Sequence, residues 1–303
     1  MNSARSARAL VALLRLPYWL MTGGLALLTA FAILKGNFSN ISTSIGMLNF
    51  GVVAILIFFS MAFIASAGFA INDYFDRESD AVIKPRRPIP SGALRLKQVV
   101  AVSVVLFASG LILSAFINWL SFTIIAVDSL LLLVYSYMVK RKSGFAANLL
   151  MGVLTGTAFV FGQATVSGTV NLISLSLYPI AFGTIGGNAL RDILSIEGDS
   201  KVGYPTLPQK IGAIGAAKVG GIFFLLTGLL SPLPALPLFT GHFTLYYLPL
   251  ILLWSVLLIY SSIRLFVSSS TIANIRKYER LVTMSMMLLP LALIVEAVLG
   301  GSI

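Results

Sequence analysis

The chain has 303 residues, of which 58% are hydrophobic and only 10% are charged, and its net charge is +11. Soluble domains carry about 25% charged residues, so this composition excludes a soluble globular protein and indicates a membrane protein. The absence of cysteine excludes disulfides and thiolate nucleophiles, and the single histidine excludes a histidine-rich metal site. In a membrane protein a basic balance is typical of cytoplasmic loops, so we expect no nucleic-acid partner.

Apolar runs long enough to cross a bilayer as helices recur along the whole chain. We predict an all-α integral membrane protein that forms a single domain over residues 1–303, with a first half at about 15–140 and a second half at about 145–300. Arg5, Arg8 and Arg15 precede the first run as in a signal peptide, but its length and the helix-starting Pro17 favour a retained span. The predicted spans cover approximately residues 17–34, 47–71, 97–117, 119–139, 145–165, 171–190, 212–230, 244–266 and 280–300.

Basic residues alternate with the predicted spans. Of the 21 lysines and arginines, only Lys35 lies on the side of the membrane opposite to the N-terminus. Because cytoplasmic loops carry an excess of lysine and arginine, this distribution predicts a multi-pass protein of the cell membrane with a cytoplasmic N-terminus. The single histidine, His242, lies in a predicted outer loop, where we expect an exposed side chain.

Most acidic residues fall in two short segments on the basic side, one after the second span and one after the sixth. This offset of four spans predicts two tandem four-helix units plus a ninth helix. The first segment holds Asp73, Asp76, Glu78 and Asp80, and the second holds Asp192, Glu197 and Asp199. If the second span continues as a helix, the aspartates of the first segment share one face.

Carboxylates stacked on one face repel one another unless positive charge lies between them. One alternative is a salt-bridge network with the surrounding lysines and arginines, which would add little stability. The other is a Mg²⁺ site, since Mg²⁺ prefers oxygen ligands and often joins one or two carboxylates to substrate phosphates. The nearby cations, which suit phosphate binding but could also be orientation signals, are Lys84, Arg86, Arg87, Arg191 and Lys201.

Three other polar residues have competing interpretations. Asp128 lies within the fourth span, where an ionisable group suggests function, so it could contact an acceptor or be a hydrogen-bonded structural acid. Asn148 and Asn188 could support ligands or join one helix to another.

The acidic segments resemble the motifs of a known family. Residues 72–80, N-D-Y-F-D-R-E-S-D, resemble the first aspartate motif of the UbiA-type intramembrane prenyltransferases, and residues 84–92 resemble its R-P-I-P-S-G tail. Residues 191–199 resemble the second motif, except that Ser195 replaces an aspartate and puts the ligands of the second metal in doubt. The resemblance extends over about residues 15–300 and points to the archaeal ether-lipid and quinone branches.

The resemblance implies nine helices around a central cavity and Mg²⁺-dependent prenyl transfer from a long isoprenyl diphosphate, such as geranylgeranyl diphosphate, to a lipophilic acceptor. It implies that the allylic cation formed by diphosphate departure is captured by a quinone precursor or a glycerol-phosphate lipid. The expected partners are these substrates and membrane lipid, with no obligate protein partner. A transporter or cation channel is the alternative, although it would place its charges deep within the spans.

The motifs and the resemblance together define the expected site. The expected catalytic residues are Asp73, Asp76, Asp192, Arg191 and Tyr135. The expected substrate-binding residues are Asn72, Lys84, Arg86, Arg87, Tyr137, Lys140, Asn188 and Lys201. The expected metal ligands are Asp73, Asp76, Asp80, Asp192, Glu197 and Asp199. Among the arginines, we expect Arg191 to matter most because it adjoins Asp192.

Overall fold

The computed structural model describes residues 3–201, 203, 205–237, 240–268 and 271–302. Within these residues, eight helical segments are long and apolar enough to cross a membrane. They are Ser6–Leu34, Phe50–Phe75, Leu96–Ile117, Trp119–Lys142, Gly144–Ser167, Leu207–Ala235, Leu248–Ser268 and Ile272–Leu299. Each of the eight overlaps a predicted span, so the prediction of an all-α membrane protein is confirmed.

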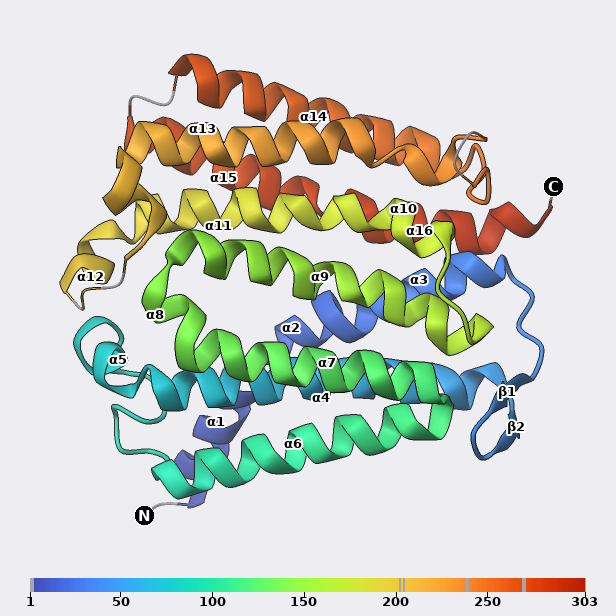
Figure 1. Cartoon of the computed structure of the whole chain (residues 1–303), viewed down its shortest axis with the longest axis horizontal. Helices are drawn as coiled ribbons and strands as arrows, with labels where there is room; N and C mark the ends of the chain where they lie inside the picture. The colour runs from blue at the N-terminus through green and yellow to red at the C-terminus, as the bar shows by residue number, and fades with distance from the viewer. Residues whose placement is uncertain (1–2, 202, 204, 238–239, 269–270, 303) are drawn as a thin grey trace.

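The predicted span at 171–190 is broken into three short pieces. These are α10 (Leu172–Leu177), the 3-10 turn η3 (Tyr178–Ala181) and α11 (Phe182–Leu194). Pro179 lies within η3. Because proline has no N–H, it cannot continue the α-helical hydrogen-bond pattern, and the helix is interrupted there. The three pieces together run along the bundle beside α9 (Gly144–Ser167), which gives a ninth, discontinuous segment (Figure 1).

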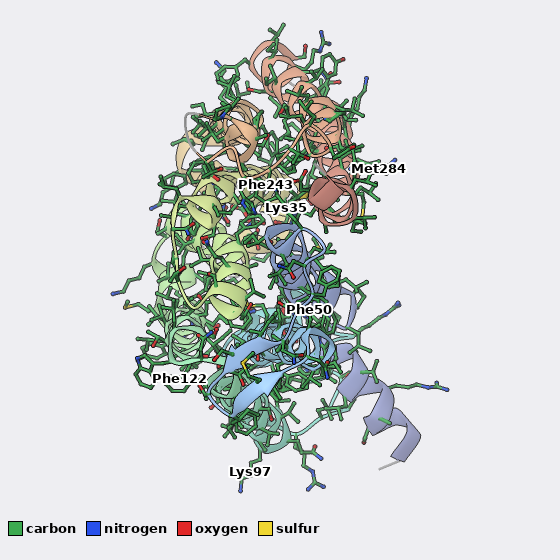
Figure 2. The ribbon with its side chains drawn as sticks, turned by 90° about the vertical axis from the view of Figure 1, so that its right-hand side faces the viewer. Lys35, Phe50, Lys97, Phe122, Phe243 and Met284 are labelled. Atoms are coloured by element: carbon green, nitrogen blue, oxygen red, sulfur yellow. The ribbon has the colours of Figure 1, made fainter. Side chains whose placement is uncertain are left out.

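The first apolar segment, Ser6–Leu34, begins earlier than the predicted span at 17–34, although a helix does start at Pro17. The N-terminal helix α1 (Ser3–Leu14) ends at Arg15, whose φ of 50° lies in the left-handed region, and Pro17 opens α2 (Pro17–Trp19). The segment continues through the π-helical turn η1 (Leu20–Gly24) into α3 (Leu25–Leu34). The break turns α1 away from the span, and α1 projects from the lower part of the bundle in Figure 2.

The remaining long helices lie side by side along the bundle (Figure 1). Helix α3 packs against both α9 and the last helix, so the first and last spans meet. A hairpin of β1 (Ile41–Thr43) and β2 (Gly46–Leu48), which the sequence analysis did not predict, joins α3 to α4. The other elements are α4 (Phe50–Phe75), α5 (Arg77–Ile83), α6 (Leu96–Ile117), α7 (Trp119–Val134), η2 (Tyr135–Val139), α8 (Lys140–Lys142), α12 (Ile196–Lys201), α13 (Leu207–Leu230), η4 (Leu233–Ala235), α14 (Leu248–Ser268), α15 (Ile272–Ser285), α16 (Leu288–Leu299) and η5 (Gly300–Ser302).

Two large apolar clusters and a smaller one around Leu13 form the interior of the described part of the chain. The first large cluster centres on α11, α13 and α14 and includes the fully buried Phe224 and the buried Trp254. The second joins α3, α4 and α9 and includes Ile57 and Phe161. Both clusters contain residues of the two halves, such as Ala32 in the first and Phe161 in the second, and the tandem relation between the halves stays a prediction.

Three polar residues outside the two acidic segments make contacts within the bundle. Asp128 on α7 accepts a hydrogen bond from Thr157 Oγ1 on α9 at 2.7 Å, so it joins these two helices. The expectation of an exposed His242 was wrong, because its ring is half-buried and its Nε2 lies 3.1 Å from the Ile33 carbonyl oxygen. Nearby, Lys35 lies 3.9 Å from the fully buried Glu296 on α16.

Candidate active site

The first acidic segment forms the end of α4 and the start of α5. Asp76 ends α4, but the backbone keeps a helical pattern, since the amide of Asp76 bonds to the Asn72 carbonyl and that of Asp80 bonds to the Asp76 carbonyl, both at 2.8 Å. Asp73, Asp76 and Asp80 are 4%, 3% and 5% exposed, whereas the Glu78 side chain is 85% exposed. The predicted shared face is therefore buried, and Glu78 is outside it.

Each buried aspartate of this segment has a cationic partner. Asp73 Oδ1 accepts from Arg15 at 2.6 Å and from Arg87 at 3.0 Å, and Arg87 also pairs with Asp80 at 2.5 Å. Asp76 pairs with Lys140 from α8. These contacts offset the repulsion among the carboxylates, because each negative charge faces a guanidinium or ammonium group.

The second acidic segment spans the end of α11 and α12. Asp192 Oδ2 accepts a hydrogen bond from Asn148 Nδ2 at 2.8 Å, so Asn148 supports a motif residue. Ser195, the residue that departs from the family pattern, donates its hydroxyl to Asp199 Oδ2 at 2.6 Å. The Glu197 side chain is exposed on α12.

The two acidic segments lie at the same end of the bundle, where α5 contacts α12 (Figure 1). Gly198 approaches α5 so closely that a Cβ at this position would lie 3.2 Å from Ile83 Cγ2. Lys140, the partner of Asp76, also attracts the Asp192 carboxylate electrostatically. Residues separated by more than a hundred positions thus form one polar region beside an apolar bundle.

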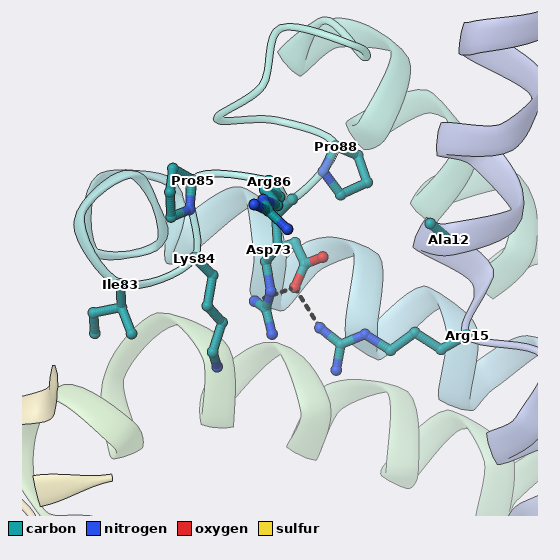
Figure 3. Close-up of a pocket in the computed structure, with 9 residues that line it drawn as sticks. Ala12, Arg15, Asp73, Ile83, Lys84, Pro85, Arg86 and Pro88 are labelled. Atoms are coloured by element: carbon teal, nitrogen blue, oxygen red, sulfur yellow. Dashed lines mark hydrogen bonds and ion pairs between the residues drawn. The ribbon is translucent and has the colours of Figure 1, made fainter.

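A pocket of about 520 Å³ opens beside Asp73 (Figure 3). Arg15 reaches it from the break between α1 and α2, and the loop after α5 supplies the opposite wall. Partial burial and the neighbouring Arg87, Lys140 and Arg15 lower the pKa of Lys84, although Asp80 opposes this shift. The lining residues are Ala12, Arg15, Asp73, Ile83, Lys84, Pro85, Arg86, Arg87 and Pro88.

Four other predicted site residues differ in burial and contacts. The Arg191 side chain is 52% exposed, and it contacts Glu279 on α15 at 3.4 Å and Asn188 at 3.2 Å rather than the first motif. Tyr137 is 65% exposed and packs its ring on Phe75, with ring centroids 5.6 Å apart. Lys201 is exposed at the end of α12, and Tyr135 is partly buried at the start of η2.

The sequence analysis missed one functional candidate, Arg15, which it treated only as an orientation signal. Its partner Asp73 is 58 residues away, across a complete span, so no local spacing connects them. The guanidinium of Arg15 also lies 4.4 Å from the Phe69 ring centroid, which fixes the side chain against α4.

Comparisons with known proteins agree with the motifs. The model of the UbiA prenyltransferase family matches residues 38–289. The digeranylgeranylglyceryl phosphate synthase of Natronomonas pharaonis is 35% identical over 229 residues, which are 76% of this chain and 78% of that protein. A solved structure of digeranylgeranylglyceryl phosphate synthase in membranes has a TM-score of 0.75 at 27% identity and covers 97% of this chain and 99% of its own. A UbiA homologue from Archaeoglobus fulgidus, bound to GPP and Mg²⁺, shares the fold with a TM-score of 0.61 at 18% identity over 94% of this chain and 99% of its own.

Proposed function

Because the chain belongs to the UbiA prenyltransferase family, we propose that it transfers a long prenyl group from its diphosphate to a glycerol-phosphate lipid. The observation that carries this proposal is the meeting of both acidic segments, with their cations, at one end of an apolar bundle. The similarity to digeranylgeranylglyceryl phosphate synthases favours a glycerol-phosphate acceptor over a quinone precursor. Family membership also favours an enzyme over a transporter or cation channel.

The donor residues of the first segment suit Mg²⁺. Among the described residues, no three acidic or histidine side chains are grouped closely enough to hold a metal ion by themselves. However, the buried Oδ1 of Asn72 has no hydrogen-bond partner, while its Nδ2 donates to Asp76 Oδ2 at 2.8 Å. An amide oxygen beside a carboxylate is a suitable ligand pair for Mg²⁺, which takes its remaining oxygens from water and phosphate.

We assign Asn72, Asp76 and Asp192 as the first candidates for metal binding, with Asp73, Asp80 and Asp199 beside them. When bound, Mg²⁺ would stabilise the negative charge of the departing diphosphate. Lys140 and Arg87 lie next to these carboxylates and can turn from them to the diphosphate oxygens as charge develops there.

The reaction itself replaces one carbon–oxygen bond by another. The bond between the allylic carbon and the diphosphate breaks, and the diphosphate leaves with the electron pair. The acceptor hydroxyl oxygen then bonds to the allylic carbon and loses its proton to water. The apolar helices provide an environment for the prenyl chain, since a long hydrocarbon is unfavourable in water.

The basic loops support a cytoplasmic position for this site. The exposed Ala81 beside the first motif and the exposed Ser44 in the hairpin at the other end allow a direct test, because the chain contains no cysteine. In sealed right-side-out vesicles, an impermeant thiol reagent should label Ser44→Cys and spare Ala81→Cys. Labelling of Ala81→Cys alone would contradict the proposed orientation and place the site on the outer side.

The acceptor is tested by product analysis. Purified protein is given labelled geranylgeranyl diphosphate, Mg²⁺ and one of two acceptors, either a glycerol-phosphate lipid with a free hydroxyl or an aromatic quinone precursor. The proposal expects a prenylated glycerolipid and no prenylated aromatic product. Transfer to the aromatic acceptor alone would place the protein in the quinone branch instead.

A further inference from the structure

We propose that the pocket between α1 and the loop after α5 binds the phosphate monoester of the acceptor lipid, with Arg15, Lys84 and Arg86 as its cations. This inference rests on the proposed function and adds a second anion site to it. The pocket has four cationic side chains in its lining and a single acidic one, Asp73. Its volume of about 520 Å³ is within the usual range of small-ligand pockets, about 300–1,000 Å³.

The charge of the pocket favours a dianionic ligand. Arg15 and Arg87 already share the Asp73 carboxylate, and Arg87 also serves Asp80. Among the described residues, no carboxylate lies within 4.0 Å of the Lys84 ammonium or the Arg86 guanidinium, so their charges are not offset by an ion pair. A phosphate monoester carries a charge of about −1.5 to −2 at neutral pH and three strong acceptor oxygens, which suits such an excess of donors.

The pocket adjoins the diphosphate site, with Asp73 and Arg87 on their common border, but its other cations lie on the far side of Asp73. Asp76, Lys140 and Asp192 form a group between α4, α8 and α11, close to the second motif. Arg15 approaches Asp73 from the other direction, from the N-terminal segment (Figure 3). Two anionic groups can therefore be held on two sides of the first motif, as a reaction between a diphosphate and a phosphate-bearing lipid requires.

The depth of the pocket also fits a lipid head group. Arg15 lies at the break between α1 and α2, near the start of the first long apolar segment, Ser6–Leu34, so the pocket is close to one end of that segment. Helix α1 forms part of the wall through Ala12, and it is fastened to the body by the buried Ala9 and Leu13. Its exposed Leu10 and Val11 can lie in the membrane surface, which keeps Arg15 at the level of phospholipid head groups.

Binding in detergent, without Mg²⁺ or prenyl diphosphate, tests this assignment directly. The ligands are a glycerol-phosphate monoether lipid and the same lipid without its phosphate, measured by titration calorimetry. Wild-type protein should bind the phosphate lipid more tightly, and Arg15→Ala should reduce that preference about 30-fold, because a charge-assisted contact is lost. Arg15→Lys should reduce this preference less. Arg8→Ala, which removes an exposed arginine from the preceding helix α1, should leave it unchanged.

Equal binding of the two lipids to wild-type protein, or an equal loss of both in Arg15→Ala, would overturn the assignment. Glycerol phosphate and inorganic phosphate form separate arms and should compete weakly, since they lack the lipid chain. Competition by either as strong as that of the lipid would assign the pocket to free phosphate and contradict a head-group site. The transfer assay separates the two proposals: absence of product in wild-type protein contradicts the function, whereas this binding test stands on its own.

Discussion

Lys140 and Asp76, which are 64 residues apart, form an ion pair that joins the end of the α7–α8 segment to the first acidic motif. The pair places an ammonium group where we expect a metal ion and a diphosphate to bind. We therefore expect Lys140 to exchange the Asp76 carboxylate for the diphosphate when the substrate binds.

Replacing Lys140 by methionine should weaken donor binding. The diphosphate loses one charge-assisted contact, worth about 2 kcal/mol or roughly 30-fold. Steady-state kinetics should show this as a higher KM for the prenyl diphosphate together with a lower kcat. The control is Lys142→Met, which removes an exposed lysine from the same short helix; equal kinetics for the two variants would contradict a specific role for Lys140.

The arginines should differ in a way that the sequence alone did not indicate. Arg87 bridges Asp73 and Asp80, whereas Arg191 is half-exposed and contacts Glu279. A lysine cannot reproduce the forked contacts of a guanidinium, so Arg87→Lys should lower kcat/KM by about 10-fold or more, and Arg191→Lys should lower it less. A larger loss at Arg191 would restore the expectation drawn from its position beside Asp192.

Loss of the charge of Lys84 at alkaline pH should weaken the binding of the phosphate-bearing substrates. Its pKa is lowered, mainly by partial burial and then by neighbouring cations, so it loses its charge below the ordinary value of 10.5. The charged form of Lys84 is disfavoured in the folded state, so protonation of Lys84 lowers the stability of the fold as the pH falls. Anion binding, in contrast, favours the protonated form. The KM for the phosphate-bearing substrates should therefore rise in the alkaline range, and Lys84→Arg should move this rise to higher pH. An unchanged profile in Lys84→Arg would exclude Lys84 as its source.

Sequence patterns predicted most of the fold because each span is a long apolar run. They also predicted that Asp73, Asp76 and Asp80 share one helix face, since helical spacing fixes it locally, whereas the burial of that face comes from tertiary packing. The break at Pro179 had a local signal, but the apolar length of 171–190 outweighed it. The β1–β2 hairpin is too short to show a clear alternation of apolar and polar residues.

Long-range side-chain contacts could not be predicted in the same way. The Arg15–Asp73 pair depends on the turn at Arg15, where a non-glycine residue has a positive φ. The direction of Arg191 depends on Glu279, which is contributed by a helix much later in the chain. The motif resemblance predicted that the two acidic segments meet, and tertiary packing decides which of their side chains face one another.

Product formation by four proteins tests the central claim that both acidic motifs form one Mg²⁺-dependent site. Wild type, Asp76→Asn, Asp192→Asn and the matched control Glu78→Gln are incubated with prenyl diphosphate and glycerol-phosphate lipid, and pyrophosphate and prenylated lipid are quantified with Mg²⁺ or with EDTA. Loss of a carboxylate that binds the metal should reduce turnover by about 100-fold or more, whereas Glu78 is exposed and its replacement should have no effect. With Mg²⁺, we predict that wild type and Glu78→Gln release pyrophosphate and prenylated lipid in equal amounts, and that either aspartate variant forms little of them. With EDTA, we predict no product from any of the four proteins. Full turnover in EDTA, or in both aspartate variants, would contradict the account.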